Sequence, residues 1–306
     1  MRIIVRSAVI AAVAAISAAS YAKNIDWKQV DDAMGRAAQV TGDVHRYGFP
    51  RTDLHVSLDG VGIKPALALG GWVAIKPSRD GAMMMGDLVL LEQEVSPVMS
   101  RLLASGFDIT ALHNHIMRAE PATFYMHVVR AGDPVLLARD LREALTVSRT
   151  PMNTSPAAPP VAIALDTAEI DRIIGAKGKA VGGVYQFGVP RKEPVTMAGM
   201  ALTPPAPLGV ATGINFQPTG NNKAAITGDF VLAAAEVNPV IRALHANGIE
   251  VTAIHSHMLD ERPRLFFLHF WANDDAVKLA KGLHAALDTI ASASSEPAAG
   301  TVGKGH

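Results

Sequence analysis

The sequence repeats itself, and this duplication constrains the fold more than any other feature. When the chain is displaced by 140 residues, Gly48 and Pro50-Arg51 coincide with Gly188 and Pro190-Arg191. Further along, the displacement becomes 142, because insertions totalling two residues fall in a less similar stretch between about 52 and 82. Chance does not sustain one register across so many Gly, Pro and His positions. Two copies of one unit therefore make up most of the chain.

The first residues have the pattern of a secretory signal. Arg2 and Arg6 precede a short apolar run, and residues 20–22 (Ser-Tyr-Ala) place small residues at the two positions that a signal peptidase reads. The run is too short to span a membrane. We therefore expect residues 1–22 to be a signal peptide, cleaved near Ala22, and the mature protein to be periplasmic or secreted without a transmembrane segment.

The rest of the chain divides into four parts. Residues 23–145 and 161–290 are the two copies, referred to as repeat 1 and repeat 2. Residues 146–160 form a Pro/Ser/Thr-rich linker that favours extended conformations. Residues 291–306 are mostly Ala, Ser and Gly, so we expect a disordered tail.

Each repeat is predicted to mix helices and strands. Asp26 and Asp166 are expected N-caps of a short first helix, with Gly35 and Gly175 as its end. Several strands, a second helix, a hairpin and a closing amphipathic helix follow in both copies. The predicted class is α+β, an internal duplication of an α-β(n)-α-β-β-α unit with antiparallel or mixed sheets and helices on one face.

Charge and cysteine content exclude several classes of function. The chain has 28 basic and 28 acidic residues, whereas proteins that bind nucleic acid or anionic membranes normally present a net basic surface. It has no cysteine, which removes disulfides, thiolate nucleophiles and Cys-type zinc sites. Any metal site must therefore use His, Asp, Glu or Met.

Three histidines recur at matching positions in both repeats. Two of them form a His-x-His pair, and residues two apart on a strand point to the same face. The third would join them if it stood opposite the first or the second across an antiparallel hairpin, which requires a loop with an odd number of residues. The two triads are His113, His115 and His127 in repeat 1, and His255, His257 and His269 in repeat 2.

Three neutral imidazoles on one face form a site for a divalent transition metal, Zn²⁺, Cu²⁺, Fe²⁺ or Ni²⁺, with positions open for water or substrate. A metal-bound water could act as a nucleophile near neutral pH, or a redox metal could handle oxygen species. In the alternative interpretation, these are half-buried strand histidines, hydrogen-bonded to backbone or carboxylates and kept in both copies by common ancestry.

Five further residues are weaker candidates. Asp87 and Asp229 follow a glycine and would orient a metal-bound histidine, or only begin a turn or strand. Arg51 and Arg191 follow a proline and would bind a carboxylate or phosphate, or form structural ion pairs. Arg264, present in repeat 2 alone, is a candidate ligand-binding residue.

Motifs in repeat 2 resemble the LppY/LpqO family of bacterial envelope proteins, classed as domain of unknown function 1259. They are Gly-Asp-Phe-Val-Leu (228–232), Glu-Val-Asn-Pro-Val (236–240) and the histidine-containing region 251–271. The resemblance covers nearly all of the chain after residue 22, in two tandem copies. It implies no established activity. Some family members look like lipoproteins, whereas this chain has no cysteine for lipid attachment.

Two functions from different classes follow. The leading hypothesis is an exported protein that binds a transition metal through the histidine triads, as two sites or as one pooled site, and acts as a metal-dependent hydrolase or redox enzyme. The alternative is a non-catalytic envelope protein that binds a small molecule, glycan or polypeptide between the repeats. An enzyme predicts converging imidazoles with a carboxylate nearby; a binding module predicts an apolar and aromatic lining.

Overall fold

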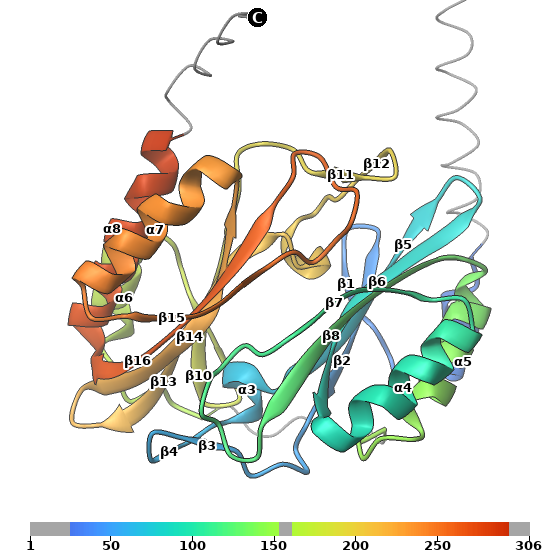
Figure 1. Ribbon diagram of the computed structural model, residues 1–306, viewed down its shortest axis with the longest axis horizontal. Helices are drawn as coiled ribbons and strands as arrows, with labels where there is room; N and C mark the ends of the chain where they lie inside the picture. The colour runs from blue at the N-terminus through green and yellow to red at the C-terminus, as the bar shows by residue number, and fades with distance from the viewer. Residues whose placement is uncertain (1–24, 153–160, 294–306) are drawn as a thin grey trace, which may run out of the picture.

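The computed structural model describes residues 25–152 and 161–293 (Figure 1). The expected signal peptide, residues 153–160 of the expected linker and residues 294–306 of the expected tail lie outside the described residues. The last helix continues through Ala293, three residues into the segment expected to be a tail. Within the described ranges, no helix is both long and apolar enough to cross a membrane.

Both repeats are α+β units. Repeat 1 contains α2 (Trp27–Met34), β1 (Gln39–Thr41), β2 (Val44–Pro50), β3 (Ser57–Leu58), β4 (Val61–Gly62), α3 (Pro65–Ala68), β5 (Gly70–Ser78), β6 (Gly81–Leu91), α4 (Glu92–Ala104), β7 (Asp108–His113), β8 (Thr123–Gly132) and α5 (Pro134–Leu145). Repeat 2 contains α6 (Thr167–Ile174), β9 (Lys179–Val181), β10 (Val184–Pro190), β11 (Thr196–Met197), β12 (Met200–Ala201), the 3-10 helix η1 (Ala206–Leu208), β13 (Ala211–Gly220), β14 (Lys223–Leu232), α7 (Ala234–Ala246), β15 (Glu250–His255), β16 (Phe266–Asp275) and α8 (Ala276–Ala293).

Each repeat is built on one six-stranded antiparallel sheet. The strand order is β1-β2-β5-β6-β8-β7 in repeat 1 and β9-β10-β13-β14-β16-β15 in repeat 2. The two orders correspond strand by strand, and every strand pair is antiparallel. The predicted duplication of an α+β unit is therefore confirmed, with antiparallel rather than mixed sheets.

The first helix of each repeat begins and ends where its capping residues predict. The Asp26 carboxylate accepts hydrogen bonds from the backbone N–H groups of residues 28 and 29, and the Asp166 carboxylate accepts one from residue 169. Gly35 and Gly175 follow each helix at φ 76, a left-handed conformation that residues with a Cβ adopt at a cost.

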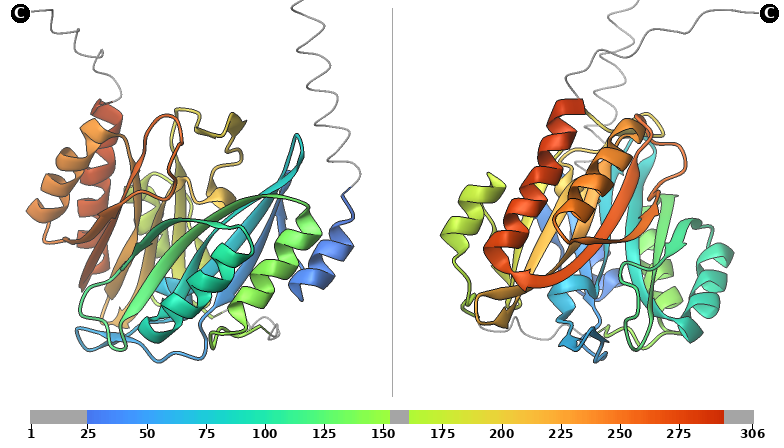
Figure 2. Two further views of the ribbon diagram at one scale, coloured as in Figure 1. Left: turned by 45° about the vertical axis from the view of Figure 1, so that its right-hand side comes forward. Right: turned by 60° about the vertical axis from the view of Figure 1, so that its left-hand side comes forward.

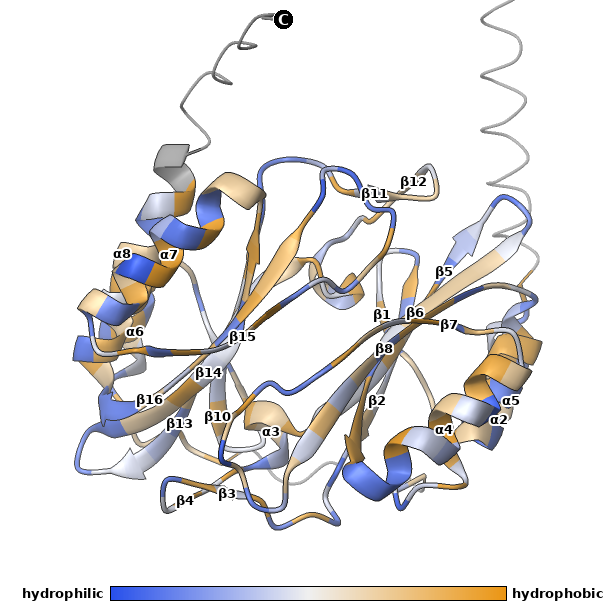
Figure 3. Ribbon diagram, in the orientation of Figure 1, coloured by the Kyte–Doolittle hydropathy of each residue, from blue (hydrophilic) through white to orange (hydrophobic). Residues whose placement is uncertain are grey.

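The outer face of each sheet is covered by three helices, α2, α4 and α5 in repeat 1 and α6, α7 and α8 in repeat 2 (Figures 1 and 2). The two inner faces look toward each other, and α3 and η1 pack between them. Strand β6 shows how the sequence allows both faces of a sheet to be covered, because all of its residues but the last are buried. Met84 and Leu88 pack under the helices of repeat 1, whereas Met83 and Met85 pack against residues of repeat 2. The outer helices mix hydrophilic and hydrophobic residues along their length, as expected for amphipathic surface helices (Figure 3).

The two inner faces are held together by reciprocal packing. Residues 56–69 of repeat 1 form a core with Val184, Ala225 and Trp271 of repeat 2. In return, residues 195–210 of repeat 2 pack on Trp72 and other inner-face residues of repeat 1. Each repeat therefore lends one connecting segment to the inner face of its neighbour, and the repeats form one body.

Gly86 and Gly228, the first residues of the two Gly-Asp motifs, lie where neighbouring strands approach closely. A Cβ on Gly86 would stand 2.5 Å from the Trp72 carbonyl oxygen, and one on Gly228 would stand 2.0 Å from the Gly213 carbonyl oxygen. Both distances are shorter than any real Cβ contact. Glycine at this position lets the two central strands pair beside the aspartate that follows.

We predict that Gly86→Ala lowers the free energy of unfolding by about 1–3 kcal/mol, because the backbone must move to admit the methyl group. The control is Gly62→Ala, since a Cβ there meets no atom within 4 Å. Urea denaturation of both variants provides the measurement. Equal stability of the two variants would contradict the assignment.

Candidate metal centre

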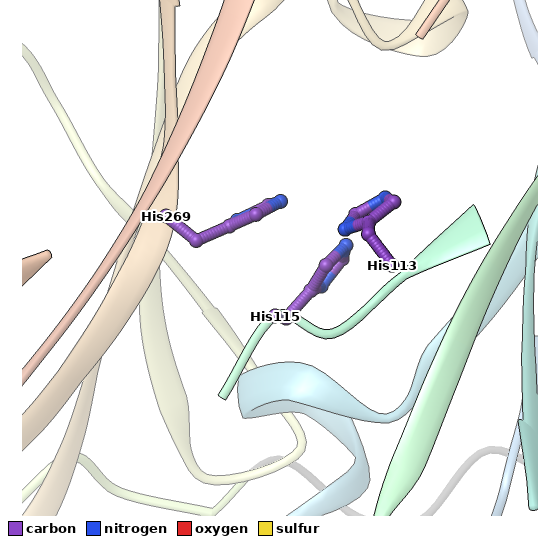
Figure 4. Close-up of side chains that lie close together, drawn as sticks. All are labelled: His113, His115 and His269. Atoms are coloured by element: carbon purple, nitrogen blue, oxygen red, sulfur yellow. The ribbon is translucent and has the colours of Figure 1, made fainter. Parts of the chain in front are cut away.

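Six histidines from the two repeats converge between the inner faces of the sheets. Figure 4 shows three of them, His113 and His115 from repeat 1 and His269 from repeat 2, with their rings directed toward one another. Four groups of three residues have nitrogen or carboxylate oxygen atoms that lie within 4.8 Å of one another. These groups are His113/His115/His269, His113/His127/His255, His255/His257/His269 and Asp87/His115/His127.

The third histidine joins the pair through a hairpin register that differs from the expected one. His127 pairs with Ala111, and His113 pairs with Tyr125, so His127 stands opposite neither His113 nor His115. The connection, residues 114–122, has an odd number of residues, as required. His113 therefore stands opposite Tyr125 and not opposite His127, a shift of two residues from the expected register. Because side chains alternate between faces along a strand, a shift of two leaves His127 on the same face of the sheet as His113. Repeat 2 has the same arrangement, with Ala253 opposite His269.

The second histidine of each pair lies beyond the strand that was expected to hold it. Strand β7 ends at His113 and β15 at His255, so His115 and His257 belong to the loops that follow. Their rings nevertheless lie 5.0 Å and 4.9 Å from those of His113 and His255, measured between centroids.

Each of these loops is held by the other repeat. The Thr110 hydroxyl donates a 2.5 Å hydrogen bond to the backbone carbonyl of His257, and the Thr252 hydroxyl donates one of the same length to that of His115. Both threonines fall at the register shift of their hairpin, where the strand is bulged. The bulge turns the threonine out of the ladder and toward the neighbouring repeat.

The cluster has a pseudo-two-fold axis. His113 and His255 stack on each other with centroids 3.4 Å apart, so they lie at the axis. The flanking stacks correspond in pairs: His115 on His269 at 3.8 Å, and His257 on His127 at 3.9 Å. The six histidines thus lie in one continuous cluster, within which the expected triad of repeat 2, His255/His257/His269, is one of the four ligand groups.

The polar atoms of the cluster lack protein partners to a degree found nowhere else in the described chain. Nine buried side-chain nitrogen and oxygen atoms have no hydrogen-bond partner there, and seven of them belong to this cluster. They are Nε2 of His115, His257 and His269, both ring nitrogens of His255, and Oδ1 of Asp87 and Asp229. Leaving a buried polar group unpaired costs about 1–3 kcal/mol.

The nitrogen geometry suits a shared ion. The Nε2 atoms of His113 and His127 lie 3.1 Å apart, within a few tenths of an ångström of the roughly 3.3–3.4 Å that separates two imidazole nitrogens bound tetrahedrally to one Zn²⁺. The Nδ1 of His269 donates to the Gly228 carbonyl at 2.7 Å, which leaves its Nε2 lone pair directed into the cluster.

Two aspartates complete the site. Asp87 Oδ2 lies 3.6 Å from His115 Nε2, and Asp229 Oδ2 lies 3.3 Å from His257 Nε2. Burial raises the pKa of Asp87 to about 7, opposed by the charge of Arg46. Burial also raises the pKa of Asp229 well above its usual value, and the charge of Asp87 adds to this effect.

Burial keeps the imidazoles neutral, which is the form that binds metal. It lowers the pKa of His113 to about 4 and that of His269 to about 3. The pKa values of the other four histidines are also depressed, first by burial and then by repulsion from neighbouring imidazoles.

A cavity of about 620 Å³ reaches the cluster. His115, His269, Asp87 and Asp229 are part of its wall, together with residues of both repeats. A volume of this size accommodates an ordinary small-molecule ligand. The cluster is therefore buried but has a route to an outside molecule.

The chain matches the family model described as Domain of Unknown Function (DUF1259) twice, over residues 28–147 and 168–289. It belongs to this family. The expected tandem pair of DUF1259 units is thus confirmed. No curated protein matches the chain. A crystal structure of the trimeric bacterial microcompartment shell protein PduB is similar over 85% of this chain and 92% of that one, at 13% identity and a TM-score of 0.22, a score too low to support a conclusion.

The structure places the candidate arginines of the DUF1259 repeats outside the cluster. All five N–H groups of Arg51 are used, by Asp53, Glu94 and the Val89 carbonyl. This buried ion pair leaves Arg51 no donor for a ligand.

Arg191 occupies the same position in repeat 2. It binds Glu236, Glu193 and the Val231 carbonyl. Arg264 binds Glu261 and backbone carbonyls of its own loop. Of the further candidates, only the two aspartates lie at the histidines.

Sequence reasoning missed several residues that shape the site. Thr110 and Thr252 match between the repeats, but nothing in the sequence reveals their bulges. The Tyr125 ring stacks on that of His115, with the centroids 3.3 Å apart. Its position two residues before His127 on one strand places both side chains on one face, so the sequence could have indicated Tyr125. Arg46 has Gln186 at the equivalent position, so the repeat comparison gives no reason to select it.

We predict that the metal-free DUF1259 protein loses stability as the pH falls below 6.5, the unfolded-state pKa of histidine. The six depressed histidine pKa values mean that unfolding takes up protons in this range. The raised pKa values of Asp87 and Asp229 act in the opposite direction, because these carboxyls gain protons in the folded state first. Six groups against two leave the histidines dominant.

Urea titrations at about pH 7.5 and about pH 5 test this, with a loss of up to about 1.4 kcal/mol per pH unit for each net proton. His255→Ala/His257→Ala should flatten the dependence, since it removes two of the groups. A wild-type stability that is constant or rises on acidification would refute the prediction.

Proposed function

We propose that this protein binds a divalent transition metal, Zn²⁺, Cu²⁺, Fe²⁺ or Ni²⁺, in the pooled histidine cluster, and that the centre acts on a small molecule in the adjoining cavity. We also propose that it works in the periplasm or outside the cell, after cleavage near Ala22. The export proposal rests on the signal-like pattern of residues 1–22, and the absence of cysteine agrees with an oxidising compartment.

The convergence of unpartnered ligand atoms carries the metal proposal. Ordinary buried histidines donate to one acceptor and accept from one donor. Here His255 has neither ring nitrogen paired, and five further nitrogens and oxygens of the cluster share that condition. A cation would take one ligand atom from each of three such side chains, and the donor set, imidazole with carboxylate, suits the four metals named.

The ligand groups limit how many ions the cluster holds. Almost any two of the four groups have one residue in common, so these pairs of groups cannot bind an ion at the same time. His255/His257/His269 and Asp87/His115/His127 share none, and they come from different repeats. The cluster therefore provides for one central ion or for two, one per repeat.

The surroundings favour an enzyme over a passive binding module. A metal ion supplies Lewis acidity, and it activates water near neutral pH. The protein supplies neutral imidazoles that hold it, Asp87 and Asp229 within 4 Å of those imidazoles, and a cavity that reaches both. Most of the surface that lines the cavity is apolar, and Trp72 and Tyr125 belong to it, as the binding module predicts too. The carboxylates beside the imidazoles are therefore what favours the enzyme.

Elemental analysis of untagged protein tests the metal centre. The wild type should retain one or two transition-metal ions per chain, and His255→Ala/His257→Ala should lose at least half. The matched control is His55→Ala/His284→Ala, which removes one exposed histidine from each repeat. Added metal should raise the melting temperature of the wild type and of the control only. A wild type without metal, and without a metal-dependent shift, would overturn the proposal.

The threonine bonds between repeats should tune the metal affinity. We predict that Thr110→Val/Thr252→Val keeps the fold but weakens metal binding about tenfold or more, because the loops of His115 and His257 lose their anchors. Competition with a chromogenic chelator measures the affinity. Thr219→Val, which removes an exposed threonine bonded to Asn273 in the same repeat, is the control. Unchanged affinity in the double variant would show that the loops need no anchor.

A further inference from the structure

The wall of the cavity beside the histidine cluster includes Arg46, an arginine without a carboxylate partner in the part of the chain that the structure describes. Arg46 projects from β2 toward repeat 2, with its guanidinium carbon 3.8 Å above the Trp72 ring centroid. One N–H donates at 2.6 Å to the Pro207 carbonyl. Among the described residues, no other hydrogen bond and no ion pair involves this guanidinium. Arg51 and Arg191, by contrast, are both paired with carboxylates.

The Arg46 side chain is half-buried and partly shielded from solvent. Burial lowers the pKa of Arg46 to about 10, and the charge of Asp87 only partly offsets this effect. A partly desolvated guanidinium is stabilised by a counter-ion, and the paired oxygens of a carboxylate or phosphate match its donors best. Arg46 therefore gives the cavity a positive wall next to the proposed metal centre.

The wall of the cavity differs between the two sides of the pseudo-two-fold axis. In repeat 1, Trp72 pairs with Asp87 across the strands; in repeat 2 the equivalent pair is Gly213 with Asp229. A Cβ on Gly213 would meet no atom within 4 Å, so the space that an indole fills beside Asp87 is empty beside Asp229. The equivalent of Arg46 is Gln186, which donates to the Ala66 carbonyl.

We infer that the cavity binds a small molecule carrying a carboxylate or phosphate group, which Arg46 holds by its oxyanion while Gly213 leaves room for it beside Asp229. The inference rests on the proposed function, because it names the class of molecule that reaches the metal centre. The loss of internal symmetry produces one such site per chain instead of two.

The repeats themselves supply the variants for the test. Arg46→Gln installs the residue that repeat 2 has at this position, and Gly213→Trp installs the residue that repeat 1 has. The first removes the cation and the second fills the space. Controls are Arg172→Gln, an exposed arginine paired with Glu169, and Gly62→Trp, a strand glycine with open space at its Cβ and outside the cavity wall.

Isothermal titration of the purified full-length proteins with inorganic phosphate and with acetate measures the binding, and glucose serves as an uncharged probe. The wild type should bind at least one of the two anions saturably. Arg46→Gln and Gly213→Trp should each weaken that binding about tenfold or more, as expected for a charge-assisted hydrogen bond or a blocked site. Both controls should stay within about twofold of the wild type. The preferred anion distinguishes a carboxylate ligand from a phosphate ligand.

Metal content, measured on the same samples, separates this inference from the metal proposal. Arg46-dependent anion binding by a chain without metal would support the oxyanion site and refute the metal centre. A metal-loaded chain whose anion binding is absent, or equal in wild type and Arg46→Gln, would refute the oxyanion site alone. The oxyanion site would also be overturned if the protein bound glucose equally well with and without Arg46→Gln and bound neither anion. If Arg46→Gln fails to fold, the anion affinity of Gly213→Trp tests the inference instead, because this variant keeps Arg46 and only fills the proposed binding space.

Discussion

The packing of the two inner sheet faces against each other is the interaction on which the rest of the structure depends. Each repeat covers the outer face of its sheet with its own helices, but its inner face carries apolar residues too, and its own connecting segment covers these only in part, so further cover is needed. The neighbouring repeat provides that cover, and the exchange of connecting segments makes it reciprocal. Burial of both faces explains why central strands such as β6 carry apolar residues almost continuously.

The histidine cluster lies buried within this interface, and its position is costly. Imidazoles and carboxylates taken out of water need partners, yet seven of their atoms have none among the described residues. The depressed histidine pKa values and the raised aspartate pKa values have the same cause, burial that disfavours charge. A protein that only needed stability would place apolar side chains here. The arrangement is consistent with a site maintained for a ligand.

Duplication gives the site its symmetry, and divergence removes part of it. The stacked rings of His113 and His255 mark the axis, and flanking ring pairs agree within 0.1 Å. Away from the axis, an indole stands beside Asp87 at Trp72, whereas Gly213 leaves that space open beside Asp229. A symmetric scaffold thus acquires a single asymmetric cavity.

The sequence by itself determined the duplication, the α+β class, the capped first helices and the six histidines, because each is a local or periodic pattern. It also favoured a shared face for His127 and His113, since face depends only on the parity of the hairpin loop. The sequence could not predict the hairpin register or the end of β7 at His113. Both accompany the bulge at Thr110, whose hydroxyl bonds to the His257 carbonyl of repeat 2. Only the tertiary structure decided that the histidines pool, that Asp87 and Asp229 join them and that Arg46 faces a cavity, since these side chains meet only when two sheets distant in sequence bury their inner faces together.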